Sequence, residues 1–273
     1  MSSQCDALAR LFRDDDPETV GLVKEQLLLQ GEKAVPDLRD LVNADSSIVA
    51  SHAQEVLHAI EGKRFSGELE ALLRGRGEIP LEEACLLVAS SLMPWIDPSE
   101  SVAALDAWGA ELRRRLTAAH TDPVSVLTGY LHGELRFDGN AKDYYNPQNS
   151  LLPCVIKERL GLPLTLTLVY LFVAARAGLP LDGVNLPGHF IARCGETYFD
   201  PFHAGRILSL ADCADILARQ EIELQDEHLE NPGNREILAR MMANLRHAYD
   251  VGGASWQKRM VDGWLGILTG ADA

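Results

Sequence analysis

The stretch "GLPLTLTLVYLFVAARAGLPLDGVNLPGHFIARCGETYFDP", residues 161–201, decides the fold, because one apolar helix in it is followed directly by two short strands. The helix is expected from about Pro163 to Ala177, where Gly178 supplies a common helix-ending residue. The strand-like stretches are residues 189–193 and 197–200. A helix followed by antiparallel strands predicts an α+β domain.

The two strands are expected to form a hairpin that places a histidine beside an aspartate. The turn is predicted at Cys194-Gly195, since glycine supplies the positive φ that two-residue turns need. In this register His189 lies directly opposite Asp200. An acid beside an imidazole is the arrangement that orients a base for a nucleophile. The question is therefore whether the chain also carries the nucleophile.

Length and charge bound the classes of protein to consider. The chain has 273 residues, enough for one large or two ordinary domains. Apolar residues make up 47% and charged residues 24%, which is an ordinary globular balance. The net charge is −15 and no cluster of basic residues interrupts it. Such a surface repels phosphate backbones and anionic lipids, so neither a nucleic acid nor a membrane is expected as a partner.

The cysteines and the N-terminus indicate a cytoplasmic protein. Five cysteines without a C-x-x-C pair fit neither a disulfide framework nor a zinc knuckle. The first residues contain no apolar signal core. The longest apolar stretch, "LVYLFVAA" at residues 168–175, is far too short to span a bilayer.

Helical segments flank the predicted α+β core on both sides. Residues 1–62 are expected to form stacked short helices that resemble a HEAT-type repeat, which either caps the neighbouring segment or binds a partner. One of these helices is expected from Pro17 to Gly31, and another from about Ser47 to Ile60. Residues 63–133 form the helical start of the core and residues 134–230 the α+β core itself. Residues 231–273 are expected to form a helical pair broken at Gly252-Gly253.

Three motifs carry a resemblance to a known family. They are "FDGNAKDYYNPQNSLL" (137–152), "LPGHF" (186–190) and "FDPF" (199–202). Together they resemble the bacterial SirB-type branch of the transglutaminase-like superfamily, over about residues 80–250. The resemblance implies a papain-like core, with a central helix packed on a small antiparallel sheet. That branch commonly ends in tetratricopeptide-like helices, and the single helical pair here is a shortened version of such a tail.

The resemblance also implies a catalytic cysteine at the start of the central helix, with a histidine and an aspartate on adjacent strands. His189 and Asp200 match the histidine and the aspartate. Counting back from Gly178 places Pro163 where the cysteine belongs, and proline has no nucleophilic atom. Thr165, in the first helical turn, is the candidate replacement. The alternative is that its hydroxyl only satisfies local backbone groups.

Further side chains are candidates for the same site. Gly188 would allow close approach of a ligand backbone, and His203 would widen the polar cluster. Asn149 and Tyr145 belong to a loop that either only holds its own shape or also lines the cleft. No metal is expected at His189, Asp200 and His203, because their spacing matches no familiar ligand pattern.

Two functions follow from these residues. In the first, the chain is a degenerate transglutaminase-like protein, a pseudoenzyme that binds a protein or peptide in its former cleft. In the second, it is an active acyl-transfer or amide-hydrolysing enzyme that uses Thr165 with His189 and Asp200. Loss of the thiolate from such a triad costs several orders of magnitude in rate, so the first function is preferred. Neither function requires a cofactor.

Overall fold

Two compact units make up the chain, of which the computed structural model describes residues 3–43, 46–75, 77–118 and 122–270. The first unit comprises residues 1–69 and 90–96, and the second comprises residues 70–89 and 97–273. The candidate site residues named from the sequence all belong to the second unit.

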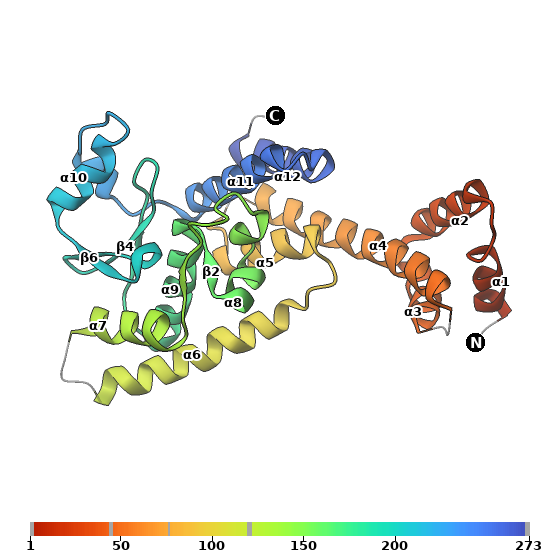
Figure 1. Ribbon diagram of the computed structural model, residues 1–273, viewed down its shortest axis with the longest axis horizontal. Coiled ribbons are helices and arrows are strands. Elements are labelled where there is room, and N and C mark those ends of the chain that lie inside the picture. Colours follow the sequence, from red (N-terminus) through yellow and green to blue (C-terminus); the bar gives the residue numbers. More distant parts are fainter. Residues whose placement is uncertain (1–2, 44–45, 76, 119–121, 271–273) are drawn as a thin grey trace. The chain divides into compact units, whose positions relative to one another are not determined.

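The first unit is built from short helices around its own apolar core. Its elements are α1 (Ser3–Leu11), α2 (Pro17–Gln30), the 3-10 turn η1 (Gly31–Ala34), α3 (Val35–Val42) and the first part of α4 (Ser47–Arg74) (Figure 1). Asp16 caps α2, since its carboxylate accepts a hydrogen bond from the backbone N–H of Glu18 at 3.1 Å. Gly31, with φ +58°, ends α2, so the helix predicted there is confirmed. Leu27, Leu38 and Val49 are among the buried side chains of the core.

Helix α4 is longer than the sequence predicted. It was expected to end near Ile60, but it continues to Arg74. Gly62 lies inside the helix and does not end it. The glycine allows a close contact there, because a Cβ would lie 3.1 Å from the Ser91 carbonyl oxygen. A single glycine weakens a helix by only about 1 kcal/mol, which packing outweighs.

The rest of the chain alternates helices with short strands. In chain order it forms α5 (Leu81–Leu92), α6 (Pro98–Ala118), α7 (Pro123–Thr128), the π-helical turn η2 (Gly129–Glu134), β1 (Asp138–Gly139), η3 (Pro147–Ser150), α8 (Leu152–Glu158), β2 (Leu160–Gly161), α9 (Pro163–Ala177), β3 (Asp182–Val184), β4 (Ile191–Cys194), β5 (Thr197–Asp200), η4 (Pro201–His203), β6 (Arg206–Leu208), α10 (Leu210–Ala218), η5 (Asp226–Leu229), α11 (Asn234–Val251) and α12 (Ser255–Thr269). Strands β3-β4-β5-β6 form one antiparallel sheet in that order, and β1 pairs with β2 in parallel.

Helix α9 is the centre of the second unit. Its bounds are those predicted, Pro163 to Ala177, and Gly178 ends it with φ +75°. It packs against α6 on one side and against β3 and β4 on another (Figure 1). Gly109 of α6 permits the close approach, because a Cβ there would lie 2.3 Å from the Cβ of Arg176. A buried helix on an antiparallel sheet, flanked by further helices, confirms the predicted α+β class.

The tail consists of α11 and α12, which pack against each other. The break falls at Gly252-Gly253, as predicted, and Gly253 has φ +69°. Met242 and Trp264 are among the buried side chains of this pair. Among the helices that the structure describes, none combines the length and the apolar character needed to cross a membrane.

The predicted register of the β4–β5 hairpin is wrong. Cys194 pairs with Thr197, so the two turn residues are Gly195 and Glu196 rather than Cys194 and Gly195. Positive φ occurs only at the first of them, Gly195 at +56°. This is the pattern of a type II′ turn, which takes glycine at its first central position. Because Gly195 occupies the first turn position instead of the second, the turn begins one residue later than predicted. His189 is therefore not directly opposite Asp200.

Candidate functional site

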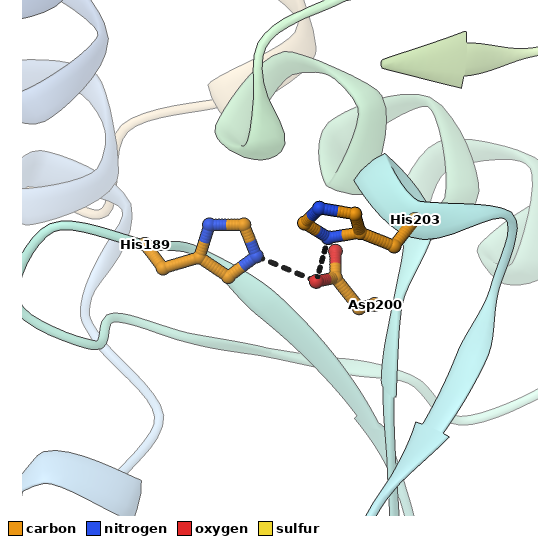
Figure 2. A group of neighbouring side chains, drawn as sticks. All are labelled: His189, Asp200 and His203. Atoms are coloured by element: carbon orange, nitrogen blue, oxygen red, sulfur yellow. Dashed lines mark hydrogen bonds and ion pairs between the residues drawn. The ribbon is translucent and has the colours of Figure 1, made fainter. Parts of the chain in front are cut away.

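Two imidazoles nevertheless converge on the carboxylate of Asp200 (Figure 2). His189 lies in the loop just before β4, Asp200 is the last residue of β5, and His203 ends η4. The distance from His189 Nε2 to Asp200 Oδ2 is 2.7 Å, and the distance from His203 Nδ1 to the same oxygen is also 2.7 Å. His189 thus reaches the carboxylate from a loop, not from the strand position that the predicted register gave it.

Asp200 is the fixed point of this cluster. It is 2% exposed, and its second oxygen, Oδ1, accepts a hydrogen bond from the backbone N–H of Phe202 at 2.9 Å. Burial alone raises the pKa of the Asp200 carboxyl, but hydrogen bonds and charge from His189 and His203 outweigh it, so the pKa is lower than usual. The group is therefore an ionised acceptor at neutral pH.

The hydrogen bonds to Asp200 determine which nitrogen of each imidazole remains available to other groups. In its neutral form His189 donates from Nε2, which leaves Nδ1 as the nitrogen available to a nucleophile. His203 donates from Nδ1 and is largely exposed, with 62% of its side chain accessible. Among the residues that the structure describes, Asp200 is the only hydrogen-bond partner of the His189 side chain. The base and its orienting acid are present, but none of the described thiols or hydroxyls is hydrogen-bonded to the base.

Thr165 is not brought together with His189. Its hydroxyl donates to the carbonyl oxygen of Asn149 at 2.6 Å and accepts from the backbone N–H of Leu162 at 3.0 Å. The side chain is 1% exposed. Both hydrogen-bonding functions of this hydroxyl are thus used by the backbone around the start of α9. Of the two roles weighed for Thr165, the structure matches the one in which it satisfies local backbone groups.

The surroundings of the cysteines in the second unit disfavour a thiolate. Burial raises the pKa of the Cys85 thiol to about 12 and that of Cys154 to about 11. The pKa values of Cys194 and Cys213 are also raised, chiefly by burial. A catalytic cysteine needs the opposite shift, toward the thiolate.

The loop before α8 is held together by Asn149. This residue is 4% exposed; its amide donates to the carbonyl oxygens of Asp143 at 2.6 Å and Tyr144 at 3.1 Å, and it accepts from Asn140 at 2.9 Å. Asn149 therefore shapes the loop from inside rather than offering its amide to a ligand. Tyr145 is 54% exposed and contacts the ring of His247.

Tyr144, not Tyr145, is the tyrosine of this loop that contacts Phe202, the aromatic neighbour of His189. Its ring lies 6.2 Å from that of Phe202, and Phe202 in turn lies 6.2 Å from the ring of His189, edge to face. The sequence did not distinguish the two adjacent tyrosines, because nothing local determines which of them contacts Phe202.

A cavity of about 310 Å³ opens beside the cluster. The predicted residues Gly188, His189, Asp200 and His203 all line it. The remaining lining comes from β6, α10 and the turn after α10, namely Arg206, Leu208, Asp212, Asp215, Ile216, Arg219 and Gln220. Gly188 has φ +75°, and a Cβ there would collide with the Gln220 amide. Nothing in the sequence singled out the lining residues of α10, because none of the family motifs includes them.

Arg240 is another residue near the site that the sequence did not single out. It lies on α11, and its guanidinium donates to the carbonyl oxygen of Leu186 at 2.8 Å and to the side-chain oxygen of Asn185. It also lies 5.7 Å from the centre of the Phe190 ring. Burial lowers the pKa of Arg240. These contacts hold the loop that leads into Gly188 and His189, which makes Arg240 a positioning residue.

Comparison with known proteins gives three levels of similarity. A family model described as "Transglutaminase-like superfamily" matches residues 99–243, just over half of the chain. The chain is 33% identical to a UPF0162 protein of Xylella fastidiosa (strain Temecula1) over 186 residues, which are 63% of this chain and 65% of that relative. It is 34% identical to a UPF0162 protein of Pseudomonas aeruginosa over 183 residues, 63% of this chain and 66% of that relative.

A longer eukaryotic protein shares a smaller segment. F-box only protein 21 of Homo sapiens is 35% identical over 134 residues, which are 45% of this chain and 21% of that protein. The matches with the two bacterial relatives span just under two thirds of those relatives' length. No solved structure matches the chain.

Proposed function

Since this chain belongs to the transglutaminase-like superfamily, we propose that it is a member without a nucleophile, which binds a protein or peptide segment beside the retained His189–Asp200 pair. The observation that carries the proposal is the state of His189. Its imidazole is oriented by Asp200 at 2.7 Å, as a catalytic base is, but no described thiol or hydroxyl hydrogen-bonds to it.

The cavity supports recognition of a polar chain segment. Its wall carries both signs of charge, with Asp215 on α10 and Arg219 directly after it, beside the apolar side chain of Ile216. A peptide offers amide, charged and apolar groups together, so a wall of mixed character suits it better than a wall of one sign. The net charge of −15 argues against a nucleic acid or a membrane as the partner.

The similarity to F-box only protein 21 supports a modular role. The shared segment is 21% of that protein, so a related domain is one part of a larger chain there. We extend the proposal to the flanks of the present chain. The HEAT-like segment at residues 1–62 and the tetratricopeptide-like pair at residues 231–273, which flank the core in the sequence, would be interaction surfaces. We further propose that the chain belongs to the SirB-type branch of the superfamily, a proposal that the three sequence motifs support.

A fluorescent peptide containing one glutamine, incubated with an amine and the full chain in the presence of a chelator, tests the proposal. We expect the peptide to bind without amine incorporation or ammonia release. Gln220→Trp, which fills the cavity beside Gly188, should weaken binding by at least about tenfold, a loss of about 1.4 kcal/mol. Binding is measured by fluorescence anisotropy and turnover by mass spectrometry of the same samples.

Gln225→Trp is the matched control, because Gln225 is exposed and does not line the cavity. It should bind the peptide as the wild type does. If the wild type incorporates the amine and His189→Ala does not, the proposal that the chain lacks a nucleophile is wrong. Failure of a panel of such peptides to bind, or equal binding by the Gln220→Trp variant, would overturn recognition at the cavity.

A further inference from the structure

The histidine pair around Asp200 has an arrangement that a catalytic triad does not need. A triad uses one imidazole on its acid, and His189 already fills that place. Here a second imidazole, His203, donates to the same oxygen at the same distance of 2.7 Å. Two ring nitrogens and one carboxylate oxygen thus point at one another around a single small volume (Figure 2).

From this geometry we infer that His189, Asp200 and His203 form a binding site for a divalent transition metal ion of the zinc type. Each residue offers one ligand atom, and these atoms all lie within 4.8 Å of one another. Ligand atoms bonded to one tetrahedral zinc ion at about 2.0–2.2 Å lie about 3.3–3.6 Å apart. Small side-chain rotations are therefore enough to bring the three atoms onto one ion.

The chemistry of the donor set also fits such an ion. Imidazole nitrogen and carboxylate oxygen together are a common set for zinc and for other first-row metals, whereas magnesium and calcium prefer oxygen alone. Each neutral imidazole would move its proton from the nitrogen that faces Asp200 to the far ring nitrogen, so no proton need leave the protein. One carboxylate charge then offsets half of the ion's charge.

The protein supports the ligands and leaves space for a further one. Asp200 is held by the backbone N–H of Phe202, and the loop that carries His189 is held by Arg240 through Leu186. All three ligands also line the cavity of about 310 Å³. A site with three protein ligands and an open position accepts water or an oxygen donor, such as a carboxylate, from a molecule bound in the cavity.

The inference does not rest on the proposed function, because an ion can bind whether or not a peptide does. The spacing of these residues along the chain did not indicate a metal, since they come from a loop, a strand end and a 3-10 turn. Their convergence is a property of the folded chain.

The test is a titration of the full chain with Zn²⁺ and with Co²⁺ alone, after treatment with a chelator and without peptide. Calorimetry should show one Zn²⁺ per chain, and Co²⁺ should give visible d–d absorption bands. His203→Gln should weaken binding of both ions by at least about 100-fold, since even residues that only support a ligand contribute about 10- to 100-fold. His203 is mostly exposed, so this variant keeps the fold, which circular dichroism verifies.

His247→Gln serves as the matched control, because His247 is an exposed histidine outside the cluster. It should bind both ions as the wild type does. Asp200→Asn should weaken binding together with His203→Gln. The inference is overturned if the wild type binds neither ion, or if both His203→Gln and Asp200→Asn bind within about threefold of the wild type.

Discussion

Replacement of Phe199 by alanine is expected to lower the free energy of unfolding by about 3–5 kcal/mol. Phe199 is fully buried on β5, and its ring centre lies 6.1 Å from that of Tyr170 on α9. The substitution removes an aromatic ring from the contact between the sheet and the central helix, where close packing leaves a cavity behind. It also loosens the strand whose last residue is Asp200. Urea denaturation followed by circular dichroism measures the change.

Ile207→Ala is the control for that loss. Ile207 pairs with Phe199 across β5 and β6 but is 53% exposed, so it should lose less than about 1 kcal/mol. Equal losses in the two variants would show that the sheet does not pack on α9 as described. The free energy of unfolding of a typical domain is about 5–15 kcal/mol. The loss expected for Phe199→Ala is a large part of it and is therefore readily measured.

The second large effect is expected at Asp200. Its replacement by alanine removes the carboxylate that accepts hydrogen bonds from the Phe202 N–H and from the imidazoles of His189 and His203. Hydrogen bonds to a charged group contribute about 1.5–3 kcal/mol each, less where a partner is exposed, as His203 is. We expect Asp200→Ala to lower the free energy of unfolding by about 3 kcal/mol, measured by urea denaturation at neutral pH.

Asp200→Asn separates the charge from the shape of this side chain. It keeps an oxygen for the Phe202 N–H but removes the ionised acceptor, so it should lose less than the alanine variant. Because the pKa of Asp200 is lowered by folding, its charge stabilises the fold above the usual aspartate pKa of about 4. That contribution is lost as the pH falls through the lower folded pKa, so the gap between wild type and Asp200→Asn should close in acid. A gap that persists there would contradict the assignment.

The central helix shows how much of the fold the sequence could predict. Proline in its first turn, an unbroken apolar run and Gly178 at its end all act locally, so its bounds were predictable. The hairpin register was not, because Cys194-Gly195 and Gly195-Glu196 are both acceptable turns until the sign of φ at each position is known. Helix α4 ran past its predicted end for a related reason, since packing overrides a single glycine.

The candidate site was predictable only where a motif carried it. His189 and Asp200 were identified from the family motifs, and the structure brings them together. The joint approach of His203 to the same oxygen depends on the 3-10 turn after β5, which nothing in the spacing fixes. Arg240 lies far along the chain, 51 residues from His189 by number, and only the tertiary fold shows that it supports the loop.

The central claim is that His189 activates no nucleophile, and covalent labelling tests it most directly. The full chain is incubated, with a chelator present, with a peptide in which a chloroacetamide-type electrophile replaces the glutamine amide, and the intact mass is followed with time. Any labelling is predicted to be slow, because no thiol is activated by His189, and to have the same rate in wild type and in His189→Ala. Rapid labelling of a single residue in the wild type, lost in His189→Ala, would contradict the account.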